Sequence, residues 1–259
     1  MNTNTEVSTF SRIPRTLPVL HVDNIVMFPY IILPLIVSDE LSKQVIDFAL
    51  SNDRLLGLFL TKEQSEKDPI KIYDHGTAVS IIKMFRTPEG SISLLLQGVS
   101  RIKVETITQS EPFIKVEVEI IPESADENAG LTALKNISIE LLGKLISESE
   151  EMNKEFVYGL KNIKQASRVA DLIAGNLNFT IEEKQQILET IELEKRFKKL
   201  NGFLANLIKQ LRIENTIRNR IQLEMDEDQR RYYLREQLDA IKKELGETDE
   251  VDQEIDKWE

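Results

Sequence analysis

The 259 residues are enough for one or two domains with hydrophobic cores, and a content of 41% apolar and 30% charged residues is typical of a globular chain in water. The absence of cysteine excludes disulfides and thiolate metal sites. A formal net charge of −11 disfavours nucleic acid as a partner, because affinity for a polyanion depends on clustered basic groups. The apolar runs are too short to cross a bilayer, so we expect no membrane partner.

The prolines divide the chain in two. All of them lie between Pro14 and Pro122, and the second half contains none. Because proline is tolerated at turns and sheet edges but breaks helices, this asymmetry predicts an α+β protein whose β-rich part comes first. The predicted divisions are a disordered leader over 1–12, a β-rich domain over 13–122, a helical bundle over 123–202, a long helix over 203–246 and an acidic linker over 247–259.

Alternating apolar residues mark the strands of the β-rich domain. Every second residue from Ile114 to Ile120 is apolar and the residues between them are charged, which predicts a strand with one face in a core and one in water. The sequence Thr87-Pro88-Glu89-Gly90 separates apolar runs at 79–85 and 92–96, and its composition predicts the turn of a β-hairpin.

Two further apolar segments, 31–37 and 55–60, are predicted strands. Between them, apolar residues recur at helical spacing and Ser38 is a suitable N-cap, so one helix is expected to interrupt the strands. The simplest fold with this order of elements is a small curled sheet or barrel that carries one inserted helix.

After Pro122 the apolar spacing becomes helical. One predicted helix carries Leu134, Ile137, Leu141 and Leu145, and a second carries Phe156, Leu160, Ile163 and Ala170. A link from Gly175 to Phe179 ends the second helix, and Thr180 with Glu183 fits a capping box that starts a third. Short connections between amphipathic helices predict a small antiparallel bundle.

The segment between Gly202 and Gly246 holds 43 residues with neither glycine nor proline. A helix of that length spans roughly 65 Å, more than a compact domain requires. Leu234, Leu238, Ile241 and Leu245 follow coiled-coil spacing, which makes them candidate assembly residues. Arginines 218, 220, 230, 231 and 235 are the one possible basic stripe, interpreted here as a solvated face paired with neighbouring glutamates.

Groups suited to catalysis are scarce. The sequence contains no phosphate-binding loop, no nucleophile elbow and no zinc-binding His-Glu-x-x-His helix. His21 and His75 are the only histidines, and both are interpreted as structural or surface residues. We therefore expect no catalytic, cofactor-binding or metal-binding residue in this chain.

Large apolar side chains beside predicted bends are the stronger functional lead. Met27, Phe28, Pro29 and Tyr30 form one such group, and Met84 with Phe85 approaches the predicted hairpin turn. Residues of this kind are usually core. The alternative is an open hydrophobic patch that accepts many client sequences, in which these six residues bind substrate.

Several segments resemble the amino-terminal region of the Lon ATP-dependent proteases, in the family's order. In the front half these are Leu17-Pro18-Val19-Leu20, Met27-Phe28-Pro29, Gly76-Thr77-Ala78-Val79 and Gln97-Gly98-Val99-Ser100-Arg101. More specific are Ile217-Arg218-Asn219-Arg220, the run from Gln229 to Gln237 and the run from Ile241 to Glu247, which are similar to the helix that leads into the Lon ATPase module.

The resemblance implies a PUA-like β domain followed by a coiled-coil-like helical region. It also implies a parent protein that is a hexameric serine protease using ATP and Mg²⁺ and degrading misfolded, damaged and short-lived proteins. The family's nucleotide-binding and proteolytic motifs have no matching positions here, so the chain is expected to be no enzyme by itself. Its expected partners are unfolded or damaged proteins, the ATPase and protease domains in cis and other copies of the chain.

The leading hypothesis is a recognition and tethering region that captures unfolded clients by apolar patches and positions them over an ATPase ring. One alternative is a coiled-coil assembly element of the hexamer, and a weaker one is a nucleic-acid-binding module. Because no export leader or Arg-rich transit sequence precedes the first predicted strand, a cytoplasmic location is expected.

Overall fold

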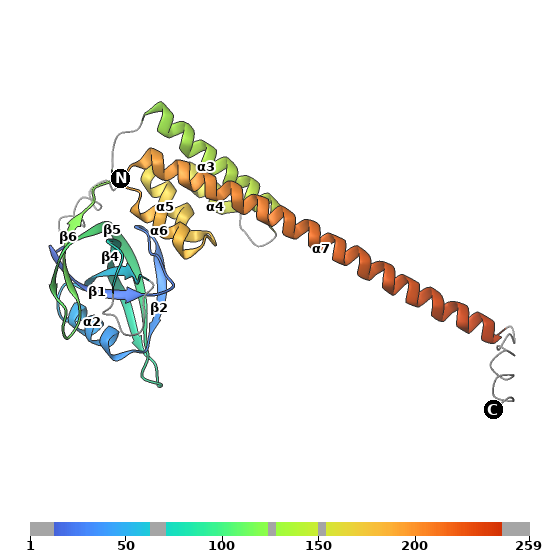
Figure 1. Cartoon of the computed structure of the whole chain (residues 1–259), viewed down its shortest axis with the longest axis horizontal. Coiled ribbons are helices and arrows are strands. Elements are labelled where there is room, and N and C mark those ends of the chain that lie inside the picture. Colours follow the sequence, from blue (N-terminus) through green and yellow to red (C-terminus); the bar gives the residue numbers. More distant parts are fainter. Residues whose placement is uncertain (1–12, 63–70, 124–127, 150–153, 245–259) are drawn as a thin grey trace. The chain divides into compact units, whose positions relative to one another are not determined.

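The structure, a computed structural model, describes residues 13–62, 71–123, 128–149 and 154–244. The described residues fall into two compact units that divide between Leu207 and Ile208. The first unit contains a β-lobe followed by a set of short helices, and the second contains the distal part of one long helix (Figure 1). The predicted leader over 1–12 and the predicted linker over 247–259 lie outside the described residues.

The β-lobe is a barrel with one additional strand. Its elements are β1 (Thr16–Val22), β2 (Ile32–Val37), α2 (Glu40–Ser51), β3 (Leu55–Leu60), β4 (His75–Arg86), β5 (Ile92–Gln109) and β6 (Lys115–Ile120). The strand order is β2-β5-β4-β3-β1-β6, and a further pairing of β5 with β6 closes all strands except β2 into a ring. All pairings are antiparallel except that of β1 with β3. The predicted hairpin is confirmed as β4 and β5.

The inserted helix α2 begins one residue later than expected. Its N-cap is Asp39, not Ser38, because the Asp39 carboxylate accepts a hydrogen bond from the backbone N of Ser42 at 2.8 Å. The helix lies against β1 and β3 and buries Val45, Ile46 and Ala49.

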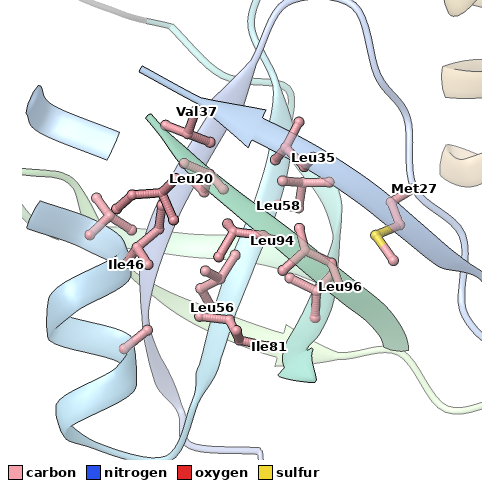
Figure 2. Close-up of a cluster of buried hydrophobic side chains, with 14 residues drawn as sticks. Leu20, Met27, Leu35, Val37, Ile46, Leu56, Leu58, Ile81, Leu94 and Leu96 are labelled. Carbon is pink, nitrogen blue, oxygen red and sulfur yellow. The ribbon is translucent and has the colours of Figure 1, made fainter. Parts of the chain in front are cut away.

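Two apolar clusters fill the β-lobe. The larger cluster joins α2 to strands β1 to β5 and includes Leu20, Ile46, Leu56 and Leu94 (Figure 2). The smaller cluster contains Leu17, Phe59, Ile102 and Val116, among others. Adjacent residues such as Val19 and Leu20 of β1, or Leu58 and Phe59 of β3, belong to different clusters, so the two clusters lie on opposite faces of these strands.

The helical elements are α3 (Ala129–Glu148), α4 (Lys154–Lys161), α5 (Ala166–Asn176), α6 (Ile181–Glu189) and α7 (Leu193–Glu244). The predicted capping box at the start of α6 is confirmed, with Thr180 and Glu183 bonded reciprocally. The prediction of a single helix over Phe156 to Ala170 is wrong, because the helix is interrupted between the end of α4 at Lys161 and the start of α5 at Ala166. Lys135 of α3 compensates this break by donating from Nζ to the carbonyl oxygens of Ile163 and Lys164 at 2.6 and 3.0 Å.

The long helix starts earlier than the sequence suggested. Helix α7 runs through Gly202 instead of beginning after it, because Phe197, Leu200 and Leu204 are all buried on its inner face. A glycine inside a helix costs about 1 kcal/mol relative to alanine, which such burial outweighs. The predicted boundary at 202/203 therefore falls inside α7, and its predicted last residues lie outside the described part of the chain.

Candidate functional site

The registers of three neighbouring strands place apolar side chains together on the outside of the β-lobe. Ser93 of β5 is paired with Ile36 of β2 on one side and with Phe85 of β4 on the other. Directly opposed residues in a sheet project to the same face. Ile36 and Phe85 are 71% and 63% exposed, so this row points to solvent.

The next rows continue the same surface. Leu95 is paired with Pro34 and with Lys83, and Gln97 is paired with Ile32 and with Ser80. Pro34 is exposed, Ile32 is 54% exposed and Leu95 is half-buried. We name the outer face as the set formed by Ile32, Pro34, Ile36, Phe85 and Leu95.

Residues between these positions point the other way. Leu35, Leu94 and Met84 form the inward row that adjoins Ile36, Ser93 and Phe85, and all three contact the larger core cluster. The outer face is therefore supported by a packed core directly beneath it. Exposed apolar surface of this kind, fixed on a rigid sheet, is typical of interaction sites.

The group around Met27 is buried, so the prediction that it belongs to an open patch is wrong. Met27 and Phe28 are 3% and 0% exposed, Pro29 is also buried, and Met27 belongs to the larger core cluster (Figure 2). Close packing explains this placement. Thr77 donates from its hydroxyl to the Met27 carbonyl oxygen at 2.5 Å. A Cβ at Gly98 would lie 2.1 Å from the Phe28 carbonyl oxygen, so only glycine fits beneath this segment.

Tyr30 and the hairpin residues divide between core and surface. Tyr30 adopts a left-handed φ of 67° and is half-buried, with the Arg168 guanidinium 5.0 Å from its ring centroid. Met84 is half-buried and packs on the core. Of the six predicted binding residues, Phe85 alone contributes to the outer face.

Sequence reasoning missed Ile32, Pro34 and Ile36. Residues 32–37 are apolar at every position, so alternation could not identify which side chains face out. The one available signal was that an all-apolar strand containing a proline belongs at a sheet edge rather than in a sheet centre.

A buried charged cluster joins the β-lobe to the helices of the first unit. Arg101 of β5 donates to both carboxylate oxygens of Asp171 in α5 and, at 2.9 Å, to Glu123. It also donates from Nε to the Leu188 carbonyl oxygen at 3.2 Å. Arg196 of α7 donates to the Thr190 and Ile191 carbonyl oxygens, and its Nη1 lies 3.6 Å from Glu123 and 3.7 Å from Asp171.

The two arginines of this cluster differ in their electrostatic balance. Burial alone would lower the pKa of Arg101, but the carboxylates of Asp171 and Glu123 outweigh it and raise the pKa. Burial, together with repulsion from Arg101, lowers the pKa of Arg196 to about 10. Arg101, Asp171 and Arg196 are almost fully enclosed, so the cluster connects parts of the unit and presents no open site.

His75 lies where β4 meets α6. Its carbonyl oxygen accepts from Gln185 Nε2 at 3.1 Å, and its own Nε2 is buried without a hydrogen-bond partner. Burial lowers the pKa of His75, and the charge of Glu189 opposes that shift. His21 lies separately in β1 and is half-buried.

Apolar side chains are also exposed along the distal part of α7. Leu234, Leu238 and Ile241 are each more than half exposed, and so are Ile213 and Ile217 nearer to the first unit in sequence. The fourth predicted assembly residue, Leu245, lies outside the described residues. This distal stripe, defined here as Leu234, Leu238 and Ile241, has the spacing of a helix-pairing seam.

A groove between α3 and α4 has a volume of about 650 Å³. Its lining mixes Lys135, Lys144, Lys161 and Glu140 with the apolar Ile139 and Val157. Glu140 and Lys144 form an exposed ion pair with each other. The groove is therefore lined by both charged and apolar side chains.

Within the described ranges, no set of three or more histidine, aspartate or glutamate side chains is arranged to hold a metal ion. The search for membrane spans, made over those residues too, found no helix with the length and apolarity that a crossing requires.

The family comparison identifies what this architecture is similar to. Residues 16–206 match the family described as the ATP-dependent protease La (LON) substrate-binding domain. The chain is 35% identical over 251 residues to a Lon protease of Dictyoglomus thermophilum, covering 96% of this chain and 32% of that protein. It is likewise 35% identical over 241 residues to a Lon protease of Trichlorobacter lovleyi, covering 92% of this chain and 30% of that protein. The chain spans about a third of the length of these curated relatives.

Solved structures show the same fold. The N-terminal domain of a Mycobacterium avium complex Lon protease superposes with a TM-score of 0.61 at 22% identity, covering 73% of this chain and 98% of that one. The Lon N-terminal domain protein from Xanthomonas campestris gives a TM-score of 0.54 at 17% identity, with the same two coverages. At these identities the likeness concerns the fold alone.

Proposed function

Because this chain belongs to the family of Lon protease substrate-binding domains, we propose that its outer face holds apolar segments of unfolded or damaged proteins. The observation that carries the proposal is the row of Ile36, Ser93 and Phe85, in which two large apolar side chains remain more than half exposed over a packed core. A face of this kind recognises apolarity and area rather than a sequence, which suits clients that have only exposed core residues in common.

The expected affinity is low. An apolar patch of about 400 Å² at roughly 25 cal/mol/Å² gives about 10 kcal/mol before costs. Association removes about 4 to 15 kcal/mol of this through lost translational and rotational freedom. With a cost at the lower end of that range about 6 kcal/mol remains, which corresponds to a Kd of about 10 to 100 μM for a single copy and is weak enough for release.

Weak capture becomes retention when copies are held together. In the proposed parent protein, the curated relatives' additional length would hold an ATPase and a protease module that use ATP and Mg²⁺, in a hexameric ring. Several outer faces on one ring raise the effective concentration of binding sites for a long client. The role of this chain is then to bind and position clients, and the chemistry belongs to the other modules.

The distal stripe supports a second function. Leu234, Leu238 and Ile241 are exposed at coiled-coil spacing, so α7 is proposed to pair with α7 of another copy. Client binding and assembly would then use different parts of one chain.

The client-binding proposal is tested by titrating the whole chain with a permanently unfolded probe, reduced and carboxymethylated α-lactalbumin, followed by fluorescence anisotropy. We expect a double variant, Ile36→Ser with Phe85→Ser, to weaken binding about tenfold or more, since each side chain contributes roughly 1 kcal/mol when half-buried. The matched control is Ile213→Ser with Ile217→Ser, which removes two apolar side chains of α7 that are also more than half exposed. Equal losses in both variants would show that general hydrophobicity, and not the outer face, binds the probe.

A further inference from the structure

Strand β2 lies at an open edge of the sheet. It is the terminal strand of the strand order, and among the described residues it is paired with β5 alone. An open edge presents unpaired backbone groups to which another extended chain can add as a strand. Such strand addition is especially favourable here, because the outer face next to this edge is apolar and its proposed clients are unfolded chains.

The direction of the backbone groups in β2 follows from one hydrogen bond. Gly98 donates from its backbone N to the carbonyl oxygen of Ile31 at 2.9 Å. In an antiparallel pair, residues alternate between those whose N–H and C=O face the partner and those whose groups face away. The backbone groups of Leu33, Leu35 and Val37 therefore face β5. Those of Ile32, Pro34 and Ile36 face the open edge.

Pro34 occupies the central position of that edge. Because its nitrogen faces away from β5, the missing N–H removes no hydrogen bond from the β2–β5 ladder. It does remove the middle donor of the open edge, and the proline ring fills the space where a partner carbonyl would approach. The exposure of Pro34 agrees with this placement.

We propose that Pro34 prevents extended polypeptides from joining the sheet at β2. As far as it concerns clients, the inference depends on the function proposed above. Clients would then bind the outer face by side-chain contact alone and dissociate readily. Each backbone hydrogen bond gained by strand addition would slow the release of a client about fivefold. A client that added to an unprotected edge would therefore dissociate too slowly to be passed on.

The inference is tested by amide hydrogen exchange in the whole chain, measured by NMR at Ile32 and Ile36. Pro34→Val restores the central donor. The matched control, Pro34→Val with Ile36→Pro, moves the missing donor by two residues along the same edge and keeps one proline in the strand. Each protein is measured at low and high concentration, and again with a short soluble peptide of alternating valine and lysine.

In Pro34→Val we expect the amides of Ile32 and Ile36 to exchange about tenfold more slowly at high concentration or with peptide, as expected for one or two new backbone hydrogen bonds. In the wild type, exchange should change less than about twofold, since no such bond forms, whereas Ile32 in the swapped variant, where the donor at position 34 is restored, should be protected as in Pro34→Val. The inference is overturned if the peptide protects the wild-type amides, or if Pro34→Val folds and gains no protection. If Pro34→Val fails to fold, the wild-type measurement with peptide still decides.

The two proposals fail separately. If unfolded clients do not shift the side-chain methyl signals of Ile32 and Ile36 in the wild type, the proposed function fails. The concentration dependence of amide exchange in Pro34→Val needs no client, so it continues to test the role of Pro34.

Discussion

The outer face and the distal stripe both leave large apolar side chains in solvent, but they are built differently. The outer face extends across three hydrogen-bonded strands and has core residues directly beneath it. The distal stripe is one line of side chains on a single helix. A broad supported face accommodates segments of varied sequence, whereas a narrow seam at heptad spacing suits another helix. Exposure alone therefore does not identify a function; the width of the surface and its support do.

The largest expected effect comes from breaking the buried charged cluster that joins the β-lobe to the helices. Asp171→Ala removes one of the two carboxylates that Arg101 and Arg196 share and leaves them buried with Glu123, and we expect the free energy of unfolding to fall by about 3 to 5 kcal/mol. Urea denaturation measures this loss. Glu140→Ala is the control, because it removes the exposed ion pair with Lys144 and should leave the urea midpoint unchanged. Similar midpoint shifts in both variants would contradict a supporting role for the buried cluster.

The next largest effect is expected from changes in the distal stripe. Replacement of Leu234, Leu238 and Ile241 by serine should weaken self-association roughly a hundredfold, since about 1 kcal/mol of apolar contact is lost at each position. Sedimentation velocity over a concentration series measures the association. Affinity for the unfolded probe should stay within about twofold, because no residue of the outer face has changed. A parallel loss of client binding would show that the two surfaces are not independent.

A smaller effect tests the contact between β4 and α6. Burial holds the pKa of His75 below its ordinary value of 6.5, so the unfolded chain binds more protons just below that pH. The stability contributed by neutral His75 is present above pH 6.5 and is lost as pH falls through the folded-state pKa. We expect His75→Gln to make the decline of unfolding free energy between pH 7 and 5 shallower, as measured by urea denaturation at each pH. An unchanged slope would show that His75 does not contribute to it.

The smallest effect is expected at the groove between α3 and α4. No atom outside the helix backbone lies within 4 Å of a Cβ built at Gly143, which lines the groove, so we expect Gly143→Phe to extend into the groove. Client affinity should change less than about twofold if the outer face binds clients. Gly202→Phe, equally free of close neighbours, is the matched control. A loss confined to Gly143→Phe would transfer the client site to the helices.

Local signals in the sequence predicted much of the fold. The turn at Thr87–Gly90, the strand at 55–60 and the capping box at Thr180 depend on neighbouring residues, and all three are confirmed. The mixed α+β class is also confirmed by the structural neighbours. The PUA-like description of the β-lobe and the coiled-coil description of α7 stay predictions.

Features that depend on distant residues were not predictable. Arg101 and Asp171 are 70 positions apart, and a single sequence gives no sign that they pair. The same holds for the outer face, because Ile36 and Phe85 meet only through their shared partner Ser93. Met27 and Phe28 look like surface candidates beside a proline until Gly98 is seen to lie against them. Phe85 was found because it lies close to a predicted hairpin turn, although Met84 and Ile92 beside the same turn pack into the core.

The most direct measurement places a photoreactive amino acid, p-benzoylphenylalanine, at position 36 of the outer face or at position 217 of α7, where Ile217 is also more than half exposed. Irradiation with the unfolded probe should give a crosslinked product from position 36 that excess unlabelled probe abolishes, and only background from position 217. Crosslinking from position 217 alone, or equally from both, would contradict the assignment of client binding to the outer face.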